Sequence, residues 1–346
     1  MQRIAQTIVS VLKKVLPILI FIIPFTMLYF LYPSSYEATW KGRTFYLFFL
    51  WLVFLEVILN WEKIQSNKLH KLKSVRTVAV IIALSLPIVY VVAANYYGLN
   101  TAIVDLAKSN DISPNVVDLM PLSMEYLVLT VLFGLIVALY YGVSDLRNFS
   151  ISTLFLGTIG MIYTIDNLYP WGRFTPFQIF VPTTTMLAAG VLNLMGFSTT
   201  ISPWYDATHS SLTYLTVNGS QGATASFPIA WPCSGVDSLL IYTVTILLFL
   251  KGSSISWKQR IGYFAFGAGV TYFVNALRIV TIFLIAMNGG DWSRFHDYYG
   301  PLYSISWIIS YPLIIMGTRT LWSRMVGSRF RMKSNVKPSL ETGIPQ

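Results

Sequence analysis

The sequence of 346 residues contains few charged residues. Asp, Glu, Lys and Arg make up 11% of it, whereas they make up about 25% of soluble domains. Hydrophobic residues account for 55%, and the mean hydropathy is +0.61. This balance excludes a soluble domain and predicts an integral membrane protein. The net charge of +10 is assigned to cytoplasmic loops, where Lys and Arg fix the orientation, and not to binding of nucleic acid.

Cysteine and histidine are also scarce. The single Cys233 excludes an intramolecular disulfide. One cysteine and three scattered histidines provide no ligand cluster, so we expect no metal site and no cofactor. The first apolar stretch is not followed by a small-residue cleavage site, which predicts a retained span or signal anchor.

The apolar stretches predict an all-α polytopic membrane protein with about eight transmembrane helices. They occupy roughly 15–32, 44–61, 77–97, 123–141, 151–165, 234–250, 261–287 and 302–320. The segments 62–76 and 251–260 and the chain after 320 are basic, whereas 98–122 carries three Asp and one Lys. By the positive-inside rule, we expect a multi-pass protein of the plasma membrane with both termini in the cytoplasm.

The segment 179–201 is a weaker candidate. It contains Pro182 and Asn193, and a full crossing would place the basic 251–260 loop outside. We therefore expect a re-entrant or interfacial helix on the outer side. After it, the runs LTYLTV and TASFPIA flank an Asn218-Gly219 pair, which predicts a short extracytoplasmic β-hairpin.

Cys233 lies where this outer segment meets the next predicted span. The preceding Pro232 suits the first turn of a helix, so we expect the thiol at a helix N-terminus, a position that favours the nucleophilic thiolate. His296 lies in the loop GGDWSRFHDYYG, which joins two spans on the same outer face. His209, in the outer polar segment, is either structural or accessory.

Arg278 lies inside an apolar helix, where a charge is costly and must face protein or water. Thr271, Asn275, Arg278 and Thr281 recur at spacings of four, three and three, which places them on one helix face. Asp237, four residues after Cys233, is expected either to orient a base or to pair with Arg278. A packing ion pair between the two would also explain their presence.

A cysteine, a histidine and an arginine at the outer ends of neighbouring spans fit covalent acyl transfer. In this hypothesis His296 accepts the thiol proton of Cys233 and later protonates the departing amine. Arg278 stabilises the oxyanion or clamps the substrate. Asp237, Asn275 and Asp297 are candidates for supporting residues. The alternative is an accidental grouping, in which Cys233 is a small buried hydrophobe.

The segments PCSGVDS, NALRI and FHDYYG occur in this order, each on or beside a predicted span. This pattern resembles that of the exosortase/archaeosortase family, which has Cys-Ser-Gly, Asn-x-x-Arg and a His before a Gly. The resemblance covers roughly 120–320. It implies that Cys233 is the nucleophile, Arg278 the essential arginine and His296 the base. We expect no long soluble domain at the C-terminal end, and in this respect the chain is more similar to the archaeosortases of the family.

The resemblance implies a membrane-embedded cysteine transpeptidase, similar to sortases in chemistry but not in fold. Its partners would be secreted or surface proteins whose C-terminal sorting signal contains a short motif, a hydrophobic helix and a basic cluster. Cleavage would form a thioester on Cys233, and an amine-bearing membrane lipid would then accept the new C-terminus. The active site would face the extracytoplasmic side.

We therefore divide the chain into an N-terminal two-span extension (1–76), a transmembrane catalytic core (77–320) and a basic cytoplasmic tail (321–346). Two other functions stay open on the sequence. An intramembrane cysteine protease would use the same residues and release its product to water. A transporter would use Arg278 and Asp237 as an ion or substrate site, although we see no internal repeat of the kind many transporters carry.

Overall fold

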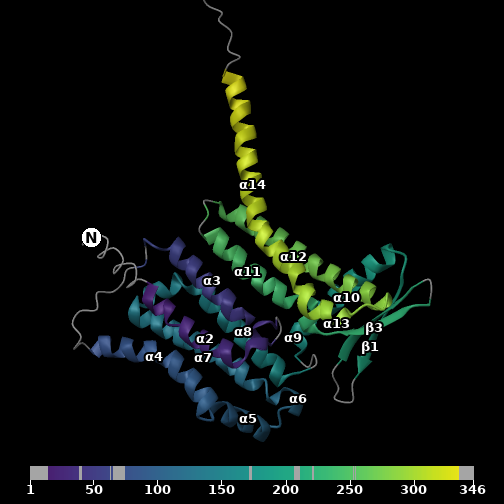
Figure 1. Cartoon of the computed structure of the whole chain (residues 1–346). Coiled ribbons are helices and arrows are strands. Elements are labelled where there is room, and N and C mark those ends of the chain that lie inside the picture. The colour runs from purple at the N-terminus through teal and green to yellow at the C-terminus, as the bar shows by residue number, and fades with distance from the viewer. Residues whose placement is uncertain are drawn as a thin grey trace, which may run out of the picture.

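The computed structural model describes residues 15–38, 41–62, 64, 75–170, 174–205, 211–219, 222–251, 253 and 255–334. Most of them form α-helices, with one small sheet at the edge of the helical body (Figure 1). The helices are α2 (Ile22–Leu31), α3 (Thr44–Leu59), α4 (Val75–Tyr96), α5 (Leu99–Ser109), α6 (Pro114–Val117), α7 (Met120–Tyr140), α8 (Ser150–Leu168), α9 (Thr175–Gln178), α10 (Phe180–Leu194), α11 (Val236–Lys251), α12 (Trp257–Met287), α13 (Trp292–Arg294) and α14 (Gly300–Ser334).

Four segments of the described chain are long and apolar enough to cross a membrane. They are Thr77–Tyr96, Pro114–Tyr140, Ser150–Leu168 and Trp257–Met287. Shorter apolar helices cover Val15–Leu31, Thr44–Leu59 and Phe180–Leu194. The chain is therefore a multi-pass membrane protein, and the total of eight spans stays a prediction.

The pairing of the predicted hairpin is confirmed and the structure adds a third strand, whereas the extracytoplasmic position of the hairpin stays a prediction. Strands β1 (Ser198–Tyr205), β2 (Ser211–Asn218) and β3 (Thr224–Ile229) form an antiparallel sheet in the order β1-β2-β3. The helix predicted over 179–201 is wrong at its end, because α10 stops at Leu194 and Ser198 already begins β1. Gly196 has a φ of +91°, a left-handed conformation that ends helices. Whether α10 is re-entrant stays a prediction.

An aromatic core joins α2, α3, α7 and α8. The rings of Phe25 and Tyr46 stack at 4.4 Å, and Tyr46 stacks on Tyr126 at the same distance. Phe49 meets Phe133 edge-on at 5.0 Å. These pairs contribute both buried apolar area and specific ring contacts, so α3 packs as a core helix of this body.

Buried ionic contacts fix α3 at both of its ends. At the N-terminal end, Arg43 donates Nε and Nη2 to the two carboxylate oxygens of Glu125 on α7, each at 2.8 Å. At the other end, Glu56 accepts the backbone N–H groups of Ile151 and Ser152 at the start of α8. A carboxylate there satisfies donors that a helix N-terminus leaves open. The Nζ atom of Lys251 in α11 lies 3.7 Å from Oε1 of Glu56.

We predict that Glu125→Ala lowers the free energy of unfolding by about 3–5 kcal/mol, because it leaves the Arg43 guanidinium buried without its carboxylate. The matched control is Asp105→Ala, which removes an exposed partner 3.9 Å from Lys108 and should change stability by less than about 1 kcal/mol. Thermal unfolding in detergent micelles measures both. Equal effects would show that the Arg43–Glu125 contact is energetically neutral.

Candidate active site

Two side chains of α12 form hydrogen bonds with the backbone carbonyl groups of Cys233 and His296. Asn275 donates from Nδ2 to the carbonyl oxygen of Cys233 at 3.0 Å. Arg278 donates from Nη2 to the carbonyl oxygen of His296, also at 3.0 Å. Because Asn275 and Arg278 are three residues apart, both point from the same helix face. The polar stripe predicted on this helix thus brings the predicted cysteine and histidine together.

Cys233 does not lie at the N-terminus of an α-helix, which corrects the prediction. It belongs to the 3-10 turn η3 (Trp231–Ser234), and α11 begins only at Val236. Between them, Gly235 adopts a φ of +93°. A Cβ at Gly235 would lie 2.9 Å from Cγ of Asn275. The glycine therefore permits both the left-handed turn and the close approach of the amide that holds Cys233.

Two residues with hydroxyl groups, which the sequence did not single out, also support the turn that contains Cys233. Thr184 of α10 is fully buried, and its Oγ1 lies 3.0 Å from the carbonyl oxygen of Ser234. The same Oγ1 lies 2.6 Å from the hydroxyl of Tyr272, which donates to Phe180 O at 2.8 Å. The only sequence signal was the run of three threonines inside an apolar segment.

His296 lies in a π-helical turn, η4 (Phe295–Tyr299). The N–H of Gly300 donates back to Phe295 O, and Pro301, next in the chain, has no N–H to offer to the carbonyl of His296. That carbonyl is the one that Arg278 binds. Single π turns are frequent at functional sites, and this one exposes a main-chain acceptor to a cation.

The Sγ atom of Cys233 lies 3.9 Å from Nε2 of His296. Both side chains are half-buried. At this distance the ring nitrogen is placed to accept the thiol proton, and hydrogen bonds of catalytic pairs commonly tighten when substrate binds. The structure therefore places a thiol and an imidazole side by side, and their roles as nucleophile and base stay a prediction.

Asp237 and Arg278 line one cavity of about 50 Å³, together with Thr44, Ser238 and Ser304. Ser238 donates to Ser304 across it at 2.8 Å. The predicted pairing of Asp237 with Arg278 stays a prediction, although both residues face this space. Asn275 contacts the Cys233 backbone directly, and its supporting role in catalysis stays a prediction.

Several predicted residues lie beyond what the structure shows. The side chain of Asp297, all of His209, and residues 335–346 of the predicted tail lie outside the described part. Within the described ranges, no group of three or more His, Cys, Asp or Glu residues is arranged to hold a metal ion.

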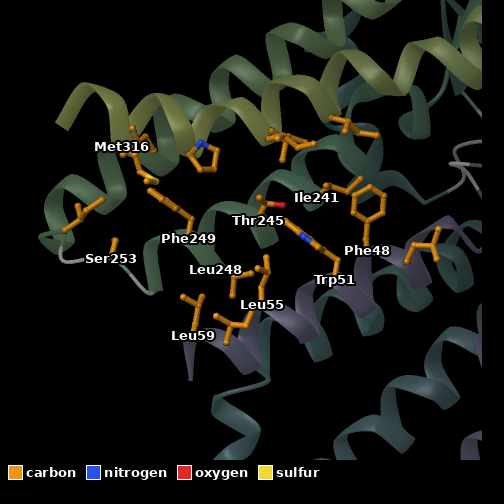
Figure 2. A pocket seen from close by; sticks show the side chains of 18 of the residues that line it. Phe48, Trp51, Leu55, Leu59, Ile241, Thr245, Leu248, Phe249, Ser253 and Met316 are labelled. Carbon is orange, nitrogen blue, oxygen red and sulfur yellow. The ribbon is translucent and has the colours of Figure 1, made fainter. Parts of the chain in front are cut away.

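A long apolar groove starts beside the cavity (Figure 2). It has a volume of about 1200 Å³ and is lined by α3, α11 and α14. Figure 2 shows side chains of α11, such as Ile241 and Thr245, between those of α3 and α14. The groove shares five lining residues with the cavity: Thr44, Phe48, Ile241, Ile305 and Ile308. Its length along α3 is about 22 Å at 1.5 Å per residue.

We predict that Gly300→Ala lowers the free energy of unfolding by about 1–3 kcal/mol through overpacking. A Cβ there would lie 2.5 Å from Nε of Arg278 and 3.2 Å from Phe295 O. Gly317→Ala, in the same helix, is the control, since a Cβ at that position meets nothing within 4 Å. Thermal unfolding compares the two variants. Indistinguishable melting temperatures would contradict the close packing of Arg278 against α14.

Comparison with family models gives a match over most of the chain. The model described as transmembrane exosortase matches residues 39–313. The match covers most of the chain, includes Cys233, Arg278 and His296, and begins before α3. Comparisons with curated proteins and with solved structures gave no match.

Proposed function

The chain belongs to the exosortase family, and from this we propose that Cys233, His296 and Arg278 are the catalytic residues of a membrane cysteine transpeptidase. Membership implies a membrane transpeptidase that takes part in processing sorting signals. The observation that carries the residue assignment is the 3.9 Å distance between Cys233 Sγ and His296 Nε2. The archaeosortase branch of the family is our preferred assignment, and it rests on the sequence alone.

In the first step, His296 Nε2 accepts the thiol proton and the Cys233 thiolate attacks the carbonyl carbon of the scissile peptide bond. The C–N bond then breaks, and the imidazolium returns the proton to the departing amine. The products are a thioester on Cys233 and a released C-terminal tail. One proton is moved, and His296 ends the step neutral.

In the second step, an amine-bearing lipid head group attacks the thioester. His296 accepts a proton from this amine as the new amide bond forms, and the sulfur leaves as thiolate and is reprotonated by the imidazolium. The surface protein then carries the lipid at its new C-terminus. If water attacked first, the same site would act as a protease.

Arg278 supports the chemistry through position and charge. Its bond to the carbonyl of His296 holds the π turn that carries the base. Arg278 also lines the cavity with Asp237, which supports a role in stabilising the oxyanion or in clamping the substrate. A lysine lacks the planar set of several N–H donors with which an arginine can bind the carbonyl of His296 and also contact the substrate.

The groove provides a place for the hydrophobic helix of a sorting signal. Its length of about 22 Å approaches the hydrocarbon thickness of a bilayer, about 30 Å. It is continuous with the cavity that contains Arg278, so a helix lying in it would present its preceding residues to Cys233. We propose the same orientation as the charge pattern predicts, with eight spans, cytoplasmic termini and the site on the outer face.

The first test uses a surface protein from the same genome that ends in a hydrophobic helix and a basic cluster. It is expressed in membranes with the wild type or with Cys233→Ala, and the product is weighed by mass spectrometry. We expect the wild type to remove the tail and add the mass of a lipid, and the variant to leave the tail intact. A trimmed product without added mass would instead establish a protease. Equal processing by both chains would exclude Cys233 as the nucleophile.

The groove is tested by Thr245→Trp, which places a large ring between α3 and α14. We expect processing of the same surface protein to slow by at least tenfold, chiefly through a higher KM, because the helix loses its space. Val131→Trp is the control, since Val131 is an exposed residue of α7 outside the groove. A rate equal to that of the control would exclude the groove as the binding place of the substrate helix.

A further inference from the structure

Strand β3 is an edge strand whose outward-facing backbone groups can be identified. Gly219 N–H donates to Ala223 O at 2.8 Å across the turn that joins β2 to β3. This bond makes Asn218 and Thr224 a non-hydrogen-bonded pair of the antiparallel ladder. Ala225, Phe227 and Ile229 therefore bond to β2. Within the described chain no strand pairs with the other side of β3, and the N–H and C=O groups of Ser226 face that side.

The positions of the two prolines in the sheet agree with this alternation of residues that bond to β2 and residues that face away from it. Pro228 in β3 and Pro203 in β1 both lie where the backbone nitrogen points away from β2. Proline is tolerated in a sheet at such edge positions, because no ladder bond is lost there. At the β3 edge, Pro228 offers only its carbonyl. Ser226 is therefore the residue nearest Cys233 within β3 that offers both a donor and an acceptor.

Strand β3 lies beside the active site. The strand continues through Ala230 into the turn that contains Cys233. The ring of Phe227 lies 4.7 Å from that of Trp292 in α13, the helix that leads directly into the turn of His296 (Figure 1). Thr224, Ser226 and Pro228 are exposed. Strand β3 therefore borders the chain segments that carry both the nucleophile and the base.

We infer that the free edge of β3 binds the segment of the substrate next to its scissile bond as an added strand. The inference rests on the proposed function, because it assumes a peptide acyl donor. An extended peptide is the ligand that this surface recognises, since main-chain donors and acceptors of an exposed edge pair with another main chain whatever its side chains. Pairing along β3 would direct the peptide toward the turn of Cys233.

The backbone test compares two proline substitutions in the full-length protein. Ser226→Pro removes the outward N–H of β3 two residues before Pro228. Ile201→Pro removes the corresponding outward N–H of β1 two residues before Pro203, at the opposite edge of the sheet. We expect Ser226→Pro to slow processing of the surface protein by about fivefold or more, the equivalent of one hydrogen bond. Ile201→Pro should stay within about twofold of the wild type.

Ser226→Pro also removes the hydroxyl contact with Thr216, in which the two oxygens lie 2.8 Å apart. Thr216→Ala controls for this loss and should stay within about twofold of the wild type. If the three variants are equally active, or if Ile201→Pro is as slow as Ser226→Pro, binding at the β3 edge is excluded.

A cross-linking test does not depend on catalysis. The Cys233→Ala, Ser226→Cys double variant is oxidised in membranes with surface-protein variants that carry one cysteine at successive positions before the cleavage site. A paired strand presents every second residue to the face of Ser226, so disulfide yield should alternate with a period of two. Uniform or absent cross-links would overturn the inference even where Cys233→Ala abolishes processing. Alternating cross-links without processing by the wild type would retain the strand site and overturn the proposed chemistry.

Discussion

The site depends on two hydrogen bonds from one membrane helix to two main-chain carbonyls. Asn275 and Arg278 of α12 hold the turns that carry Cys233 and His296. These turns come from segments about 60 residues apart in sequence, and their side chains come within 3.9 Å. Removing either donor would leave a main-chain acceptor in a half-buried place without its partner, which costs free energy. The positions of the thiol and the imidazole thus follow from α12 more than from their own elements.

The local backbone makes both of these hydrogen bonds possible. Gly235 turns the chain in a left-handed conformation so that Asn275 can approach Cys233. At the other anchor, Pro301 cannot donate to the carbonyl of His296, and the absence of a Cβ at Gly300 leaves room for Arg278. Residues without chemistry of their own therefore determine which carbonyls the polar side chains of α12 bind.

The wall of the groove is held in place at both ends of α3. The Arg43–Glu125 contact links α3 to α7, and Glu56 links it to the start of α8 and to Lys251 of α11. Apolar packing in a membrane has little of the hydrophobic driving force available in water, so polar contacts carry more of the specificity between helices. The family match begins at residue 39 and so includes this helix, whereas the predicted boundary at 76/77 leaves it in an extension. That boundary stays a prediction.

The sequence by itself determined the membrane class, the hairpin and the candidate trio, because each depends on composition or on local pattern. Apolar runs, an Asn-Gly turn between β-branched segments, and rare Cys, His and Arg residues are visible without a fold. Only the tertiary structure decided that Cys233 lies in a 3-10 turn, that β1 replaces the end of the predicted 179–201 helix, and that Thr184 and Tyr272 support the site. It also decided that Arg278 binds a main-chain carbonyl. These features arise from contacts between segments distant in sequence, and hydrophobic periodicity carries no information about such contacts.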